Sequence, residues 1–191
     1  MPELREPAGP GDPGLREGGR IRVELPGAFW AGRKAERVLM GLEACNIALR
    51  FTGVHELAGD RDNPWIQAFL SLCSGFDGDT HDEVPWCSAF VNACHWLAGL
   101  PRTKSASARS WLTLGIRIPL SAAARGDIVV LKRGGEDQPG VEVLAAQGHV
   151  GFFAGLSPDG QLVHVLAGNQ GDAVNITAFP IDRILAVQRV Q

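Results

Sequence analysis

The sequence has little of what several classes of protein require. Its 191 residues include no tyrosine and only four cysteines, and its formal net charge is −3. Proteins that bind nucleic acid or an anionic membrane usually carry more Lys and Arg than Asp and Glu, so neither partner is expected. The cysteines, at positions 45, 73, 87 and 94, form no CxxC pair. This spacing argues against a disulfide scaffold and against a structural zinc site.

Long apolar runs are also missing. No stretch approaches about 20 apolar residues, and the N-terminus lacks the basic start and apolar core of a secretory signal. We therefore expect synthesis in the cytoplasm and no membrane span. Residues 1–25 are rich in Pro, Gly and charge, and cannot bury enough apolar surface to offset the entropy of ordering. The sequence predicts a disordered arm over 1–25 and a single domain over 26–191.

Helical spacing of apolar residues marks the first part of the domain, whereas short β-branched segments mark the second. Helices are predicted over about 29–51, 64–75, 85–98 and 105–115. After Arg125, five segments are separated by Gly, Pro and Asp turn signals, which predicts an antiparallel sheet of about five strands. Helices followed by strands favour an α+β fold, with the helices packed on one face of the sheet.

The segment PWCSAFVNACHW, residues 85–96, places Cys87 in the first turn of the third predicted helix. Unpaired backbone N–H groups and the positive end of the helix dipole meet there. Such a position favours the thiolate, which is the form that attacks a carbonyl carbon. Cys94 lies on the same helix face and fits an ordinary core position. Cys87 is therefore the candidate nucleophile, provided that a base lies nearby.

His149 is the candidate base, because it opens the predicted strand GHVGFFAG, whose glycines leave space beside the ring. A three-residue hairpin loop after this strand would pair Ser157 with Gln161. Counting back eight residues on each strand places Asn169 opposite His149, where its carbonyl oxygen can orient the ring. A two-residue turn would instead bring His164 to that face, so His164 is the alternative third residue.

Each of these residues, taken singly, also fits a structural role: Cys87 as the start of a buried stripe, His149 as a hydrogen-bonded strand residue, and Asn169 as a turn residue. Together they predict papain-type thiol chemistry without a cofactor. A zinc site from Cys87, Cys94 and His95 is disfavoured, since the two cysteines lie two helical turns apart.

Over about residues 50–190 the chain resembles the NlpC-like and CHAP-like cell-wall peptidases of the papain-like superfamily. The resemblance rests, in order, on DNPWIQAFL, VPWCSAFVN, SASARSWLTLG, RGDIVVLKRG, GHVGFFAG and AGNQGDAVNI. It implies a papain-like fold and a metal-free hydrolase that cuts amide bonds of peptidoglycan peptides. Cys87 would be the nucleophile, His149 the base and Asn169 the orienting residue. Whether the enzyme is an endopeptidase or an amidase stays open.

Three further residues are expected to bind the substrate. Trp86 and Ser88 flank Cys87, and Trp111 follows in the next predicted helix, so all three are candidates for the groove. Because tryptophan is large and apolar, a place in the core is the alternative for Trp86 and Trp111.

A wall-cutting enzyme made without a secretory signal has to reach the periplasm or cell wall by another route. We expect a phage lysin, an antibacterial toxin delivered by a secretion apparatus, or a hydrolase carried by phage-tail machinery. A toxin would imply an inhibitor, or immunity, protein in the producing cell. The alternative functions are a catalytically inactive wall-binding module and a thiol acyltransferase or deamidase that uses the same three residues.

Overall fold

The structure is a computed structural model that describes residues 41–75, 81–134 and 137–190. The arm expected over 1–25, the proposed domain start at 26 and the first part of the predicted helix over 29–51 lie outside the described residues. Of that helix, residues 41–50 are helical.

Two further α-helices form where the sequence predicts them. The first, α2 (Pro64–Ser71), is capped by Asn63, whose side chain accepts a hydrogen bond from the Trp65 N–H at 3.0 Å. The second, α3 (Cys87–Leu97), is followed by Gly99 with a φ of 68°, a left-handed conformation that suits the end of a helix. Its first residue is the candidate nucleophile.

The segment expected as a fourth α-helix is instead the 3-10 helix η1 (Ala108–Thr113). It leads into a six-stranded antiparallel sheet with the strand order β1-β6-β2-β3-β4-β5. The strands and their short 3-10 connections are β1 (Ile116–Ile118), η2 (Leu120–Ala122), β2 (Ile128–Lys132), β3 (Gly148–Leu156), β4 (Leu162–Ala167), β5 (Asn175–Pro180), η3 (Ile181–Arg183) and β6 (Ile184–Arg189). The α+β prediction is confirmed, and the short strand β1 is the one that was not expected.

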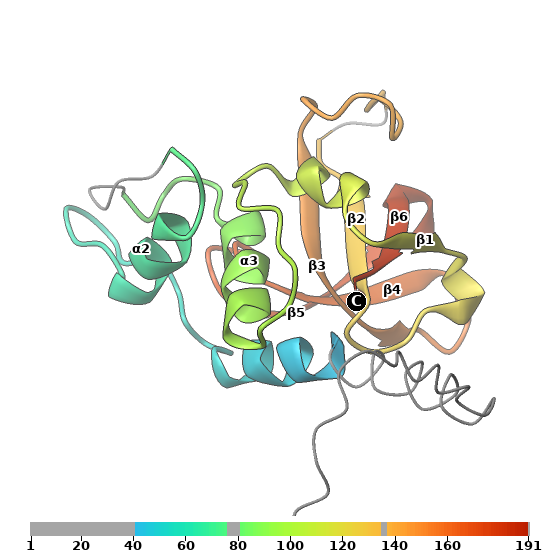
Figure 1. The fold of residues 1–191 in the computed structure, drawn as a ribbon, viewed down its shortest axis with the longest axis horizontal. Helices are drawn as coiled ribbons and strands as arrows, with labels where there is room; N and C mark the ends of the chain where they lie inside the picture. The colour runs from blue at the N-terminus through green and yellow to red at the C-terminus, as the bar shows by residue number, and fades with distance from the viewer. Residues whose placement is uncertain (1–40, 76–80, 135–136, 191) are drawn as a thin grey trace, which may run out of the picture.

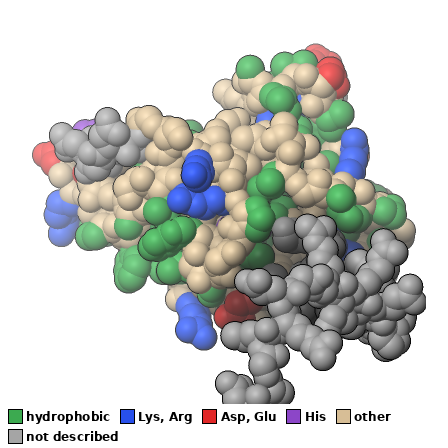
Figure 2. All heavy atoms as spheres, viewed as in Figure 1, with side chains coloured by type: hydrophobic (Ala, Val, Ile, Leu, Met, Phe, Trp, Pro, Cys, Tyr) green, Lys and Arg blue, Asp and Glu red, His purple; other side chains and the backbone are tan. Residues whose placement is uncertain are grey.

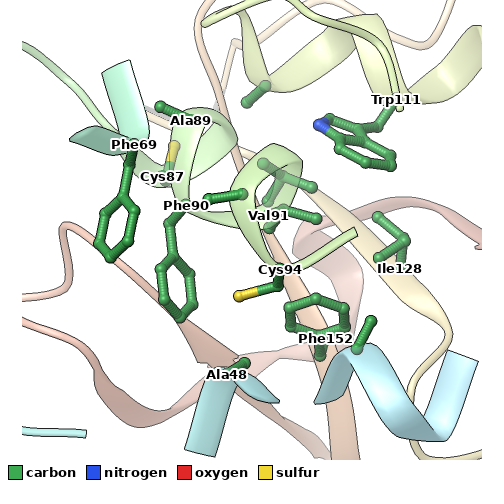
Figure 3. Packing of buried hydrophobic residues seen from close by; sticks show 14 of the residues in the cluster. Ala48, Phe69, Cys87, Ala89, Phe90, Val91, Cys94, Trp111, Ile128 and Phe152 are labelled. Carbon is green, nitrogen blue, oxygen red and sulfur yellow. The ribbon is translucent and has the colours of Figure 1, made fainter. Parts of the chain in front are cut away.

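The helices gather on one side of the sheet, as Figure 1 shows. Their core includes Phe90 and Cys94 of α3 together with Phe152 of β3 (Figure 3). Val150 of β3 belongs to the same cluster. The opposite face of the sheet has its own smaller cluster, to which Leu131 and five other strand residues belong. Apolar side chains from the short 3-10 helices η2 and η3 and from the end of β5 cover that cluster. The α-helices contribute to the first cluster only, so the prediction that they pack on one face of the sheet is confirmed for the described residues.

The β3–β4 hairpin differs from the predicted three-residue loop. The Ser157 N–H donates to the Leu162 carbonyl at 2.9 Å, so the loop is one residue longer than expected. A bulge between Phe153 and Gly155 takes up the extra residue. Beyond the bulge, Phe152 pairs with Leu166, as the predicted alignment requires.

No helix among the described residues is long and apolar enough to cross a membrane. On the face drawn in Figure 2, the Lys and Arg side chains lie scattered among uncharged atoms and form no extended basic surface. This distribution agrees with the small negative net charge of the sequence.

Candidate active site

Cys87 begins α3 and turns its thiol toward the start of β3. The side chain is 2% exposed, and the Val150 backbone N–H faces the sulfur. Burial raises the pKa of the Cys87 thiol, and this effect outweighs the lowering by the Val150 N–H and by the charge of Arg133. The expectation that the helix N-terminus favours the thiolate is therefore wrong for this state of the protein, because desolvation dominates.

His149 lies at the start of β3 and is also buried. Its Nε2 atom is 3.1 Å from Oε1 of Gln170, and its ring packs on Phe179 with the centroids 5.5 Å apart. Burial lowers the pKa of His149 to about 4, the Gln170 hydrogen bond opposes this shift, and the charges of Arg133 and Arg183 add to it. The imidazole is therefore neutral near pH 7.

The contacts of Gln170 fix the tautomer of that imidazole. The Gln170 amide nitrogen donates to the Asn175 carbonyl at 2.7 Å and to the Val165 carbonyl at 3.3 Å. Oε1 is therefore the atom that faces His149, and it can only accept a hydrogen bond. The ring must donate from Nε2, which leaves the lone pair on Nδ1. A neutral imidazole with a free Nδ1 is a general base.

Gln170, not Asn169, is thus the partner of His149, and the prediction for Asn169 is wrong in its geometry. The paired part of β4 ends at Ala167, before Asn169 is reached. Asn169 then adopts a left-handed conformation with a φ of 58°, which turns the chain and brings the next residue to the ring. His164, the alternative, pairs with Gly155 far along the hairpin and lies about 20 Å from the start of β3 at the usual strand rise.

The three residues expected in the substrate groove are buried instead. Trp86, Ser88 and Trp111 each have 0% exposure. The Trp111 indole N–H donates to the Ser88 hydroxyl at 3.0 Å, and that hydroxyl donates to the Ser105 carbonyl at 2.6 Å. These polar groups find partners inside the protein, so all three residues support the nucleophile segment from within the core.

One carboxylate links the two ends of the site. Oε1 of Glu56 accepts from the Trp86 indole N–H at 2.7 Å and from the Asn169 side-chain amide at 3.0 Å. Trp86 precedes the nucleophile and Asn169 precedes Gln170. Burial raises the pKa of Glu56, while these two hydrogen bonds oppose the shift. Glu56 therefore holds both segments in place, a role that its isolated position in the sequence did not indicate.

Cys87 and His149 open onto two cavities that share one residue. Cys87 lines a cavity of about 400 Å³ and His149 lines one of about 410 Å³. The exposed Arg133 lines both. Among the described residues, no hydrogen bond joins the Cys87 sulfur to the His149 ring. The sulfur meets the backbone at Val150, one residue beyond His149.

The structure thus brings Cys87 and His149 to the same end of β3 and supplies an orienting side chain. Gln170 and Arg133 were missed by the sequence analysis. Gln170 had a signal, because it directly follows Asn169 in the motif AGNQGDA. Arg133 had none, since a basic residue after a strand is common on protein surfaces.

The residues considered for zinc are placed for other roles. The Cys94 side chain lies further down α3 than Cys87 and points toward Ala48 (Figure 3). The Nδ1 atom of His95 is 2.8 Å from the Pro101 carbonyl oxygen. Within the part of the chain that the structure describes, no group of three or more His, Cys, Asp and Glu side chains is placed to hold a metal ion.

No protein-family model and no curated protein matches the chain. Among solved structures, the fold is similar to the P60 domain of an antigen from M. avium subspecies paratuberculosis. The match has a TM-score of 0.43 and 15% sequence identity, and it covers 82% of this chain and 96% of the P60 chain. At these values the likeness is distant, and the function has to be inferred from the residues of this chain.

Proposed function

We propose that this protein is a cysteine-dependent hydrolase that cleaves an amide bond of a peptidoglycan peptide. Cys87 is the nucleophile, His149 the general base and acid, and Gln170 the residue that orients the imidazole. The observation that carries the proposal is the buried hydrogen bond between His149 and Gln170, at 3.1 Å, beside the strand segment that the Cys87 sulfur contacts. The peptidoglycan substrate is supported by the resemblance of the motifs around these residues to cell-wall peptidases.

The resting site holds a neutral thiol and a neutral imidazole, because burial disfavours the charged form of each. As the sulfur of Cys87 forms a bond to the scissile carbonyl carbon, its proton passes to Nδ1 of His149. The electron pair of the carbonyl moves to the oxygen, which becomes an oxyanion. The imidazolium that forms keeps its Nε2 donation to Gln170, so the base does not rotate during the step.

The oxyanion finds donors at the start of α3. The backbone N–H groups of Cys87 and Ser88 face the sulfur and belong to the first turn, where an α-helix leaves its N–H groups without helical partners. Removal of one such donor costs about 3 to 4 kcal/mol in comparable acyl transfer.

His149 then returns its proton to the nitrogen of the scissile amide, the carbon–nitrogen bond breaks, and the amine leaves. A water molecule attacks the remaining thioester while Nδ1 accepts its proton, which releases the acid and restores the thiol. In the resting state the sulfur and the ring share no hydrogen bond, so we infer that the substrate draws them together. Catalytic hydrogen bonds commonly tighten only in the substrate complex.

The route to the cell wall forms part of the proposal. Delivery by a secretion apparatus or by phage machinery would bring the enzyme to the periplasm, and an inhibitor that covers the Cys87 cavity would protect a producing cell. Fractionation of the producing cells with an antibody against the full chain tests this part of the proposal separately from the chemistry.

The chemistry is tested by mass spectrometry of purified sacculi incubated with wild type, Cys87→Ala and Cys73→Ala. Cys73 is a buried free cysteine two residues beyond the end of α2 and is the matched control. We expect wild type and Cys73→Ala to release fragments and Cys87→Ala to release none. In H₂¹⁸O, hydrolysis adds one ¹⁸O to the new carboxylate, whereas an acyltransferase would add an amine instead. Equal digestion by Cys87→Ala would exclude Cys87 as the nucleophile.

A further inference from the structure

The cavity beside His149 is lined by three cationic side chains. Lys132 ends β2, Arg133 follows it, and Arg183 ends η3, so two separate segments of the chain supply the charges. The cavity also contains Asn169, Gln170 and Thr177, and none of its lining residues is acidic. Three like charges around one cavity repel one another, and an anion within the cavity would relieve that repulsion.

Among the described residues, Arg133 and Arg183 each donate only one hydrogen bond, and each of these is long. The contact of Arg133 with the Asn169 oxygen and the contact of Arg183 with the Gly134 carbonyl are both 3.4 Å long, which is long for a hydrogen bond. Among the described residues, neither arginine nor Lys132 forms an ion pair. The two ion pairs found there are Arg189–Asp127 and His81–Asp62. Within residues 41–75, 81–134 and 137–190, the guanidinium groups therefore keep N–H donors for a ligand.

The position of the cavity indicates which half of the substrate it receives. During acyl transfer the general acid has to lie beside the nitrogen of the leaving amine. His149 lines this cavity, whereas Cys87 lines the neighbouring one. Arg133 lines both and so lies close to the scissile bond. The leaving amine then occupies the cationic cavity, and the acyl half occupies the cavity of Cys87.

We propose that this cavity is a carboxylate-binding subsite, and that the preferred substrate releases an amine whose own residue carries a free carboxylate. The proposal rests on the function proposed above and narrows its substrate class. Arg133 and Arg183 bind the carboxylate through paired N–H donors, which match its planar shape, and Lys132 adds a third positive charge.

The test uses two synthetic peptides that are identical except for a carboxylate or a carboxamide on the leaving residue. We expect wild type to cleave the carboxylate peptide with a kcat/KM at least about tenfold higher, as charge-assisted hydrogen bonds predict. Arg133→Gln and Arg183→Gln should reduce this ratio toward one. Arg50→Gln removes the same charge from an exposed position at the end of helix 41–50, and should leave the ratio unchanged.

The test depends on the ratio of the two kcat/KM values and not on the cleavage rate of either peptide. The rate itself can change in Arg133→Gln for another reason, because Arg133 also affects the pKa values of Cys87 and His149. Equal kcat/KM values for the two peptides in wild type, or an unchanged ratio in both arginine variants, would overturn the subsite while Cys87-dependent cleavage could still stand.

If neither peptide is cleaved, binding measurements still test the carboxylate subsite independently of catalysis. Calorimetry with Cys87→Ala should show at least about tenfold tighter binding of the carboxylate peptide than of the carboxamide, and Arg133→Gln in the same background should remove the difference. Equal binding of the two peptides, or tighter binding of inorganic phosphate than of the carboxylate peptide, would overturn the proposal.

Discussion

Gln170 determines how His149 can act, and this is the main feature of the site at the scale of single residues. Its amide nitrogen is held by backbone carbonyls, so its oxygen has to face the ring and the ring has to donate from Nε2. Nδ1 then keeps the lone pair that a general base needs. In the proposed mechanism, the two buried groups are neutral at rest and exchange a proton only when the thiol attacks.

The first prediction concerns that orientation. Gln170→Ala should lower kcat by about tenfold or more, because the imidazole can then adopt the wrong tautomer or rotate. Asn169→Ala should have a smaller effect, since Asn169 contacts Glu56 and Arg133 and not the ring. Steady-state kinetics on one peptide substrate measure both. A larger loss for Asn169→Ala would restore the original assignment of Asn169.

The second prediction concerns the pH profile. In the proposed mechanism His149 acts as a neutral base, and burial lowers its pKa to about 4. The acid limb of kcat/KM should therefore lie near pH 4, well below the ordinary histidine value of about 6.5. In Gln170→Glu, a carboxylate beside the ring should raise the pKa of His149 and move the limb to higher pH. A wild-type limb at pH 6.5 would show that the ring is solvated in the working enzyme.

At the scale of elements, the site depends on two segments held by one side chain. The helix start at Cys87 and the turn at Gln170 are far apart in the sequence, and Glu56 binds the residue that precedes each of them. Gly168 allows the close approach of these segments, because a Cβ at this position would overlap the Trp86 ring. The turn after β4 and the start of α3 are therefore packed as one unit.

The third prediction follows from this bridge. Glu56→Ala leaves the buried Trp86 N–H without a partner and should lower the free energy of unfolding by about 1 to 3 kcal/mol. It should also lower kcat, because both segments lose their common support. Glu56→Gln keeps an acceptor oxygen and should retain most of the stability and activity. Urea unfolding and kinetics on the same samples check this prediction, and wild-type kcat in Glu56→Ala would contradict a positioning role.

The elements of the fold were more predictable than the contacts between them. Pro64 and Gly99 act through local backbone preferences, so the sequence indicates where α2 begins and where α3 ends. The partner of His149 depends on the end of β4 at Ala167 and on the left-handed Asn169, and neither leaves a signal in the apolar pattern. Trp86 and Trp111 can be buried without an unsatisfied N–H because distant polar groups accept from them, and local pattern does not reveal those partners.

At the scale of the whole molecule, the order of helices and strands was enough to predict an α+β fold. The same arrangement buries two histidines, His95 and His149. His95 stacks on Phe152 on the side of the helices, and its Nε2 has no hydrogen-bond partner in the described part of the chain. His149 packs on Phe179 of β5. Burial lowers the pKa of each to about 4.

The fourth prediction is acid lability. Between pH 6.5 and 4 the unfolded chain binds protons at these histidines that the folded protein does not, so their contribution is fully present above pH 6.5 and is lost as pH falls. From pH 7 to pH 5, each histidine should lower the free energy of unfolding by about 2 kcal/mol. Urea unfolding at the two pH values measures the loss, and His149→Ala should remove about half of it. Equal stability at both pH values would contradict the burial of these rings.

The rate at which iodoacetamide alkylates Cys87 shows whether the His149 imidazole accepts the Cys87 proton. Wild type and His149→Ala are treated with iodoacetamide at pH 7, and peptide mass spectrometry follows Cys87 alongside Cys73 as an internal control. We predict that His149→Ala slows the modification of Cys87 by at least about tenfold and leaves that of Cys73 unchanged, since base catalysis of this kind contributes about 10²- to 10⁴-fold. The same rate of Cys87 modification in both proteins would show that His149 is not the base for Cys87.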